Sequence, residues 1–209
     1  MELPLSPNSL KVRQLVLASS SPRRRELVSS LDLSLPVLIL STDTDERTPP
    51  EWAPSHIVEQ LALRKAHAAI SMLEGELASH SVIIGADTIV VVDGEVLGKP
   101  KDEADAADML LKIQGRQHQV YSGVACIRTQ DGLEQVAHRM TLVSMKPLEL
   151  DRIKRYVATG EPMDKAGSYA IQGLGATLVN GIDGCYFNVV GLPLSLLSDM
   201  LSTFGIDVF

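Results

Sequence analysis

The feature that most constrains the fold is an apolar run that passes directly into a capped helix. Residues 15–18 (LVLA) have the composition of a short strand, and three serines follow at 19–21. Ser21 is a good N-cap and Pro22 suits the first helical position, so a helix is predicted to begin there. The chain is therefore expected to contain a strand that leads straight into a helix, as in α/β folds.

Three consecutive arginines occupy the first turn of this predicted helix. Cations are disfavoured at this end of the helix dipole, and a broken local rule is where function is expected. Free backbone N–H groups and basic side chains attract phosphate, which predicts an anion site; a solvated basic turn is the alternative. Arg23 lies four residues before Leu27, near the buried edge, and is the better candidate ligand. Arg25 is predicted to point away from the buried face.

Size and charge restrict the function classes. The 209 residues suit one domain, and we expect a leader over 1–12 before a single two-lobed domain over 13–209. The net charge of −7, the pI of about 5.2 and the aromatic content of 4% argue against nucleic-acid and anionic-membrane partners. The sequence contains no signal-peptide pattern and no apolar run of membrane-spanning length, so a cytoplasmic protein is expected. Cys126 and Cys185 have no metal-like or redox spacing and are interpreted as reduced structural residues.

A carboxylate interrupts the most apolar stretch of the chain. Residues 81–92 (SVIIGADTIVVV) are predicted to be rich in strand, and Asp87 lies in their middle. An ionised carboxylate buried there is costly unless it is paired or metal-bound. The alternative is a turn formed by Gly85 and Asp87 between two strands. That turn would place Asp87 at a strand end, where α/β folds collect their ligands.

A second charge lies on the apolar face of a predicted helix. Residues 55–76 have helical periodicity, with Ser55 as the predicted cap and Met72 among the inward positions. Lys65 falls in the middle of the apolar stripe, whereas Arg64 and His67 are predicted to point elsewhere. Lys65 therefore either extends to the edge of the stripe or points into a pocket, where its charge would need a partner.

The rest of the pattern alternates strands and helices. Asp93-Gly94 predicts a hairpin turn. The glycine-rich stretch 160–175 predicts either a connecting loop or a place where backbone approaches a ligand closely. The other predicted elements are strands at 35–40, 95–97, 120–128 and 135–145, helices at 102–113, 150–160 and 194–204, a polar loop at 41–50, and a strand-to-helix turn at 187–193.

Five motifs, in order and with matching spacing, resemble the Maf family of nucleoside triphosphate pyrophosphatases. They are ASSSPRRREL at 18–27, GADTIV at 85–90, LGKP at 97–100, DKAGSYAIQG at 164–173 and NVVGLP at 188–193. The resemblance implies an α/β fold with a mixed, curved sheet and flanking helices, split into two lobes around a nucleotide cleft. It also implies hydrolysis of a nucleoside triphosphate to the monophosphate and pyrophosphate with a divalent cation, Mg²⁺ or Mn²⁺.

The resemblance implies roles for single residues. Asp87 is the expected proton acceptor. The residues expected to set substrate choice are Arg23, Thr88 and Gln172. The expected phosphate contacts are Ser19, Arg23, Lys65, Lys99 and Lys165. The expected metal ligands are Glu46, which shares its loop with Asp43 and Asp45, and Asp87.

Substrate preference is predicted from residues 169–173. Their Gln-Gly form resembles the branch that acts on dTTP and UTP, whereas the branch that acts on 7-methyl-GTP carries Glu-Gly. The Gln172 amide offers a donor and an acceptor that suit the edge of a pyrimidine. The chain departs from the family pattern at Ala170, where glycine is commoner, and at 185–187. Two alternatives stay open: a pyrophosphatase for 7-methyl-GTP or other modified purine nucleotides, and a non-catalytic nucleotide-binding regulator of cell division. The oligomeric state is open too, a homodimer being one outcome.

Overall fold

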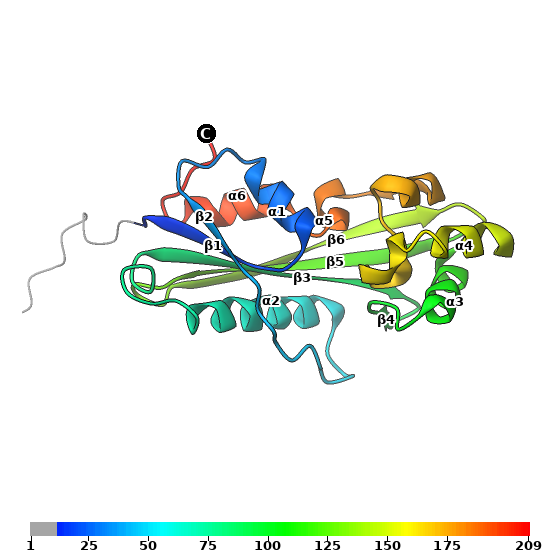
Figure 1. The fold of residues 1–209 in the computed structure, drawn as a ribbon, viewed down its shortest axis with the longest axis horizontal. Coiled ribbons are helices and arrows are strands. Elements are labelled where there is room, and N and C mark those ends of the chain that lie inside the picture. Colours follow the sequence, from blue (N-terminus) through cyan, green and yellow to red (C-terminus); the bar gives the residue numbers. More distant parts are fainter. Residues whose placement is uncertain (1–11) are drawn as a thin grey trace, which may run out of the picture.

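Within residues 12–209, a mixed sheet of seven strands runs through the middle of the molecule (Figure 1). The computed structural model describes residues 12–209, so the predicted leader lies almost wholly outside the described residues. The strands are β1 (Gln14–Ala18), β2 (Val37–Leu40), β3 (Ser81–Val92), β4 (Glu95–Leu97), β5 (Gln117–Arg128), β6 (Glu134–Met145) and β7 (Val179–Asp183). Their order is β2-β1-β3-β5-β6-β7, with β4 paired to β3. β1 is parallel to β2 and β3, and the other pairs are antiparallel, which confirms the predicted mixed sheet.

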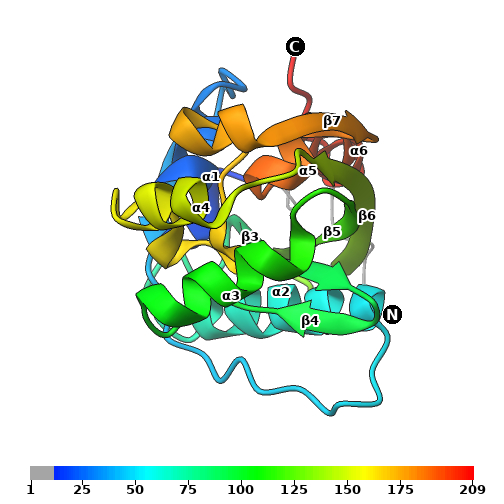
Figure 2. The same cartoon turned by 90° about the vertical axis from the view of Figure 1, so that its right-hand side faces the viewer.

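Helices cover both faces of this sheet. They are α1 (Pro22–Ser29), α2 (Pro54–Ile70), α3 (Glu103–Ile113), α4 (Leu150–Val157), α5 (Tyr186–Val190) and α6 (Leu194–Ser202). Figure 1 shows α1 and α6 on one face and α2 on the opposite face, while α3 and α4 gather with β4 at one end of the sheet (Figure 2). Within residues 12–209, none of the helices combines the length and the apolarity needed to cross a bilayer.

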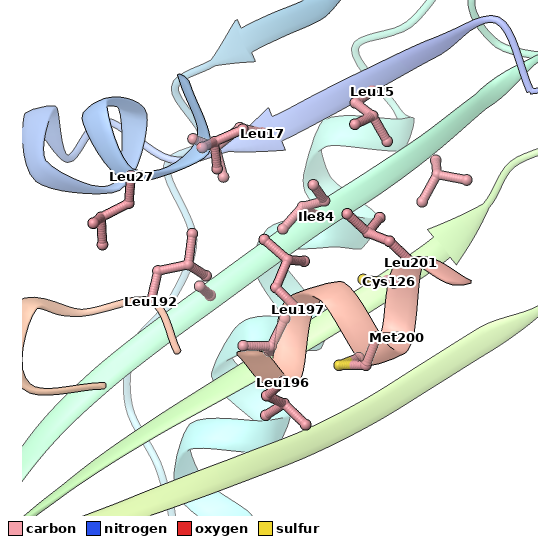
Figure 3. Packing of buried hydrophobic residues seen from close by; sticks show 14 of the residues in the cluster. Leu15, Leu17, Leu27, Ile84, Cys126, Leu192, Leu196, Leu197, Met200 and Leu201 are labelled. Atoms are coloured by element: carbon pink, nitrogen blue, oxygen red, sulfur yellow. The ribbon is translucent and has the colours of Figure 1, made fainter. Parts of the chain in front are cut away.

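Two lobes can be distinguished by their hydrophobic cores. The first lobe contains β1, β2, α1, α2 and α6, and its main core packs side chains of β1 and β3 against α6 (Figure 3). The second lobe contains β4, α3 and α4, whose buried side chains form a separate cluster with the far ends of β3, β5 and β6. The three 12-residue strands connect the lobes, because each contributes residues to both.

Helix α2 lies unusually close to the sheet because two strand positions have no side chain. A Cβ atom added to Gly85 in β3 would lie 2.1 Å from the carbonyl oxygen of Ala62. A Cβ atom added to Gly123 in β5 would lie 2.2 Å from the carbonyl oxygen of Val58. These two glycines therefore allow the backbone of α2 to rest directly on β3 and β5.

The edge of β3 is open in the middle of the strand. β1 pairs with β3 as far as Gly85, and β4 begins to pair at Val90. Within the described chain, residues 86–89 therefore pair on one side alone, with β5. β1 reaches this gap with its carboxyl end, the usual place for ligands in α/β sheets.

Most predicted elements are confirmed, including the Asp93-Gly94 hairpin and the helix predicted at 102–113, which is α3 with Asp102 as its N-cap. Residues 81–92 form one continuous strand, so the predicted turn alternative at Gly85 and Asp87 is wrong. α2 begins at Pro54, with Ala53 rather than Ser55 at the N-cap, because proline suits the first helical position. The helix also ends at Ile70, six residues before the predicted end.

The end of the predicted helix 55–76 and the strand-to-helix turn at 187–193 need correction. Met72 was predicted to face inward, but it follows the end of α2 and is half exposed. Residues 186–190 form the short helix α5 instead of a strand, and β7 was not predicted. The cause of α5 is tertiary: the buried Asn188 amide donates to the Val120 carbonyl and to the Thr141 hydroxyl.

Candidate functional site

A cavity of about 510 Å³ lies at the open edge of β3, between the two lobes. Its walls come from the β1–α1 turn, the loop before α2, α2 itself, β3, the segment after β4 and the glycine-rich stretch. The structure brings every sequence-predicted site residue into this one cavity: Ser19, Arg23, Glu46, Lys65, Asp87, Thr88, Lys99, Lys165 and Gln172. The roles assigned to these residues stay predictions, but their convergence is a property of the fold.

Asp87 and Lys65 form a buried ion pair at the floor of the cavity. Asp87 lies on the face of β3 that α2 covers, and Lys65 Nζ is 2.5 Å from Asp87 Oδ1. The two side chains are only 10% and 12% exposed, respectively. Lys65 therefore points into a pocket and does not extend to solvent. Because α2 rests on Gly85 and Gly123, its lysine can reach the carboxylate on the strand below.

A second carboxylate meets the same ammonium group from the loop before α2. Glu46 Oε1 lies 2.8 Å from Lys65 Nζ. Burial raises the pKa of Glu46, but the hydrogen bond and charge of Lys65, with the charges of Lys99 and Arg24, outweigh burial and leave that pKa below its usual value. Among the acidic residues of this loop, Glu46 contacts Lys65, whereas Asp45 is bound by the guanidinium of Arg47.

The loop that carries Glu46 is fastened to α2 by Arg64. One guanidinium nitrogen of Arg64 donates to the backbone carbonyls of Asp45, at 3.0 Å, and of Arg47, at 2.8 Å. These carbonyls lie on either side of Glu46. The guanidinium also stacks over the ring of Trp52, 5.8 Å from its centroid. Arg64 was predicted to point away from the apolar stripe of its helix, and its contacts with the loop backbone confirm this; they hold the loop on both sides of Glu46.

Sequence reasoning missed Arg24, which is partly buried and held by two other parts of the chain. Its guanidinium donates to the Gly191 carbonyl at 2.8 Å and to the Thr88 hydroxyl at 2.9 Å. Burial lowers the pKa of Arg24, and the charge of Asp87 acts in the opposite direction. A signal was present in the sequence, because Arg24 lies three and four residues before the buried pair Leu27 and Val28, at the centre of the buried face.

Arg23 reaches across the cavity to the second lobe. Its guanidinium lies 3.1 Å from Asp164 Oδ2, and Lys165 Nζ lies 2.6 Å from Asp164 Oδ1. Burial raises the pKa of Asp164, but its hydrogen bonds to Lys165 and Arg23 outweigh burial and lower that pKa overall. A single carboxylate therefore neutralises one cation from each lobe, where two phosphate oxygens would find the same partners.

The remaining predicted residues line the cavity from three other segments. The Ser19 hydroxyl accepts from the backbone N–H of Ser21, which shapes the turn into α1. Lys99 follows β4 and is exposed, close enough to Glu46 to lower its pKa. Gln172 is partly buried and lies between two short 3₁₀ turns, 166–168 and 173–178. The glycine-rich stretch thus forms a wall of the cavity and is more than a connection.

Known proteins resemble this chain over nearly its whole length. A family model described as "Maf-like protein" matches residues 14–204. A protein of Pelotomaculum thermopropionicum named dTTP/UTP pyrophosphatase is 51% identical over 197 residues, covering 94% of this chain and all of the relative. Proteins of the same name from Symbiobacterium thermophilum and Moorella thermoacetica are 49% and 50% identical, covering 95% and 94% of this chain and 97% of each relative. The family model and these relatives span nearly all of the described residues, and the chain belongs to the Maf-like protein family.

Proposed function

We propose that this protein is a nucleoside triphosphate pyrophosphatase that hydrolyses dTTP and UTP to the monophosphate and pyrophosphate. The observation that carries the proposal is the convergence of two carboxylates and a group of cations, drawn from both lobes, on one cavity at the open edge of β3. Relatives named dTTP/UTP pyrophosphatase, about half identical over nearly their whole length, support the same reaction and substrates.

Asp87 is the proposed general base. Hydrolysis adds water to the α-phosphorus and breaks its bond to the oxygen that bridges to the β-phosphorus, so a proton must leave the water as pyrophosphate departs. Asp87 is buried, contacts the Lys65 side chain and faces the cavity, which suits a group that accepts this proton. Lys65 keeps the carboxylate oriented and adds positive charge near the reacting phosphate.

Phosphate binding is assigned to the cations around the cavity. Arg23 has the planar fork that suits bidentate phosphate contacts, whereas Lys65, Lys99 and Lys165 act as point charges. Ser19 adds a hydroxyl at the turn into α1. Catalysis of phosphoryl transfer is mostly positioning and charge stabilisation, so a cluster of this kind is the main requirement.

The donor set of the cavity fits a divalent metal ion. The carboxylates of Glu46 and Asp87 both contact the ammonium of Lys65, and their oxygens are the hard ligands that Mg²⁺ and Mn²⁺ prefer. In the described chain no group of three or more His, Cys, Asp or Glu side chains is placed to hold a metal ion. With Glu46 and Asp87 as the proposed protein ligands, water and substrate phosphate would supply the other oxygens. When bound, such an ion lowers the pKa of coordinated water and neutralises phosphate oxygens.

Base recognition is assigned to Gln172, whose amide can pair with the donor and acceptor on the edge of a pyrimidine. Thr88 has a more indirect part in this proposal. Its hydroxyl accepts from Arg24 and lies 2.8 Å from the Ser122 hydroxyl, so we assign it to orienting Arg24 beside the substrate. A site built on such hydrogen bonds rejects analogues that leave its groups unpaired.

The acidic charge supports the remaining proposals. A net charge of −7 fits a protein whose partner is a small nucleotide and not a nucleic acid or an anionic membrane. Dimerisation stays a prediction, to be measured by the mass of the protein in solution.

A nucleotide panel tests the proposed function. Pyrophosphate release is measured for dTTP, UTP, CTP, GTP and 7-methyl-GTP, with Mg²⁺ or Mn²⁺, on the wild type and the Gln172→Glu variant. We expect the wild type to prefer dTTP and UTP and the variant to lose this preference. Faster cleavage of GTP or 7-methyl-GTP by the wild type would favour the purine alternative. Tight nucleotide binding without pyrophosphate release would favour the regulator.

A further inference from the structure

A single carboxylate holds the segment that follows Gln172. Glu161 Oε2 accepts from the backbone N–H of Leu174 at 2.9 Å, and Glu161 Oε1 accepts from the backbone N–H of Gly175 at 2.8 Å. Glu161 begins the first 3₁₀ turn of the glycine-rich stretch, more than ten residues earlier in the chain. Charge-assisted bonds of this length are among the stronger ones in proteins, so the backbone after Gln172 is firmly anchored.

A buried phenol holds the segment that precedes Gln172. The Tyr156 hydroxyl, from α4, accepts from the backbone N–H of Ala170 at 3.2 Å and donates to Glu161 Oε1 at 2.8 Å. The Tyr156 ring is packed in the core of the second lobe. Glu161 and Tyr156 therefore form one connected unit, here called the clamp, which binds the backbone on both sides of Gln172.

Close packing at Gly173 and Gly175 holds the backbone after Gln172 against the clamp. A Cβ atom added to Gly173 would lie 2.6 Å from Glu161 Oε2, and Gly173 has a positive φ of 63°. A Cβ atom added to Gly175 would lie 2.6 Å from the Tyr156 hydroxyl and 2.3 Å from the Ala170 carbonyl oxygen. The two glycines thus let the backbone approach the clamp as closely as its hydrogen bonds require.

The negative charge of Glu161 suits the three hydrogen-bond donors that it contacts. Burial raises its pKa, but the backbone N–H groups of Leu174 and Gly175, with the Tyr156 hydroxyl, outweigh burial and hold the pKa below its usual value. An ionised carboxylate accepts through both oxygens, so it satisfies all three donors at once. A glutamine at this position has one oxygen and would present its NH₂ group to a backbone N–H.

We infer that Glu161 and Tyr156 are positioning residues for base recognition, because they fix the backbone from which the Gln172 amide is presented to the nucleotide. The inference rests on the proposed function, which assigns base recognition to Gln172. Neither clamp residue is assigned a contact with substrate. Their effect belongs to discrimination between bases, not to the phosphate chemistry at Asp87.

The test is a comparison of discrimination in single and double variants. Discrimination is the kcat/KM for UTP divided by that for GTP, measured with Mg²⁺. We expect Glu161→Gln to lower it by about tenfold or more, the effect of losing a hydrogen bond to a charged group, chiefly through a higher KM for UTP. Tyr156→Phe keeps the packed ring and should lower discrimination less. Glu149→Gln removes the same charge from an exposed position beside α4 and should leave discrimination unchanged.

A double-variant cycle separates positioning from general damage. If Glu161 acts through the Gln172 amide, Glu161→Gln lowers discrimination in the wild type but not in a Gln172→Ala background. Hydrogen exchange adds a readout that needs no turnover: the amides of Ala170, Leu174 and Gly175 should exchange faster in the clamp variants while amides of β5 keep their protection.

Two results overturn the inference, and each is distinct from failure of the proposed function. The first is that both clamp variants keep the discrimination of the wild type, in an enzyme that prefers UTP and loses this preference when Gln172 is replaced. The other is an equal fall in discrimination with and without Gln172, which would make Glu161 merely structural. If the wild type does not prefer UTP, the proposed function itself fails and the inference falls with it.

Discussion

Substitution of Gly123 by alanine should separate α2 from the sheet and damage the site at a distance. The added Cβ would lie 2.2 Å from the Val58 carbonyl oxygen, 2.4 Å from its carbon and 2.8 Å from the Glu59 nitrogen. All three are backbone atoms of α2, so no side-chain rotation can relieve the contact. Separation beyond 3.0 Å, the closest approach that Cβ atoms show, requires a displacement of roughly 1 Å.

The displacement of α2 should also change the ion pair between Lys65 and Asp87 at the floor of the cavity. Gly123 is the register partner of Asp87, and Lys65 lies on α2 about two turns after Val58. A helix raised by about 1 Å withdraws Lys65 from Asp87, and misplacement by this amount costs on the order of 10²-fold in rate. Overpacking of a dense core also costs about 1–3 kcal/mol of unfolding free energy.

Two measurements on matched variants test this reasoning. Urea unfolding gives the change in the free energy of unfolding, and pyrophosphate release from UTP gives kcat/KM. Gly181→Ala is the control, because Gly181 also lies in a strand but has open space around its Cβ position. If Gly123→Ala matches this control in both stability and kcat/KM, close contact between α2 and β5 does not position Lys65, and the explanation is wrong.

Three further changes have expected outcomes. Asp87→Asn should lower kcat for UTP by at least about 10²-fold, the contribution of a general base, while the cooperative unfolding transition is kept. Asp164→Asn should lower the KM for UTP by about two- to fivefold, because phosphate no longer competes with an exposed carboxylate for Arg23 and Lys165. His118 is buried, and burial lowers its pKa to about 4, so the unfolded chain binds a proton more readily and stability falls as the pH drops from about 6.5 towards 4. The loss at pH 5 relative to pH 7.5 is about 2 kcal/mol and should be smaller in His118→Gln.

Each of these three predictions would be contradicted by a specific result. Near-normal turnover by Asp87→Asn would remove it from the role of base. A KM for UTP that rises in Asp164→Asn would mean that the carboxylate organises the two cations for substrate and does not compete with it. An unfolding free energy that falls equally with pH in wild type and His118→Gln would assign the acid sensitivity to other groups.

Local sequence signals predicted the elements whose causes are local. Asp93-Gly94 supplies the two positive φ angles, 51° and 80°, that a two-residue hairpin turn needs, so the turn between β3 and β4 was readable directly. Asp102 caps α3 by accepting from the Asp105 N–H three residues later, another contact within one turn. The motifs, each a contiguous stretch, likewise contain seven of the nine predicted site residues, whereas Glu46 and Lys65 lie outside them.

Contacts between distant segments decided the rest. Residues 186–190 became α5 because Asn188 is bound by β5 and β6, which no local pattern records. Arg24 was missed because its partners Gly191 and Thr88 come from two other parts of the chain.

The sequence by itself determined that a strand enters a capped basic helix and that one carboxylate interrupts the most apolar stretch of the chain. It left open whether Lys65 extends to solvent or enters a pocket, and which loop acid accompanies it. Only the tertiary structure decided both, because two glycines on neighbouring strands bring α2 down onto the sheet and Arg64 holds the Glu46 loop against that helix. The periodicity of a sequence indicates which face of a helix or strand is buried. Which side chains meet on that face depends on how closely the backbones of distant segments approach each other.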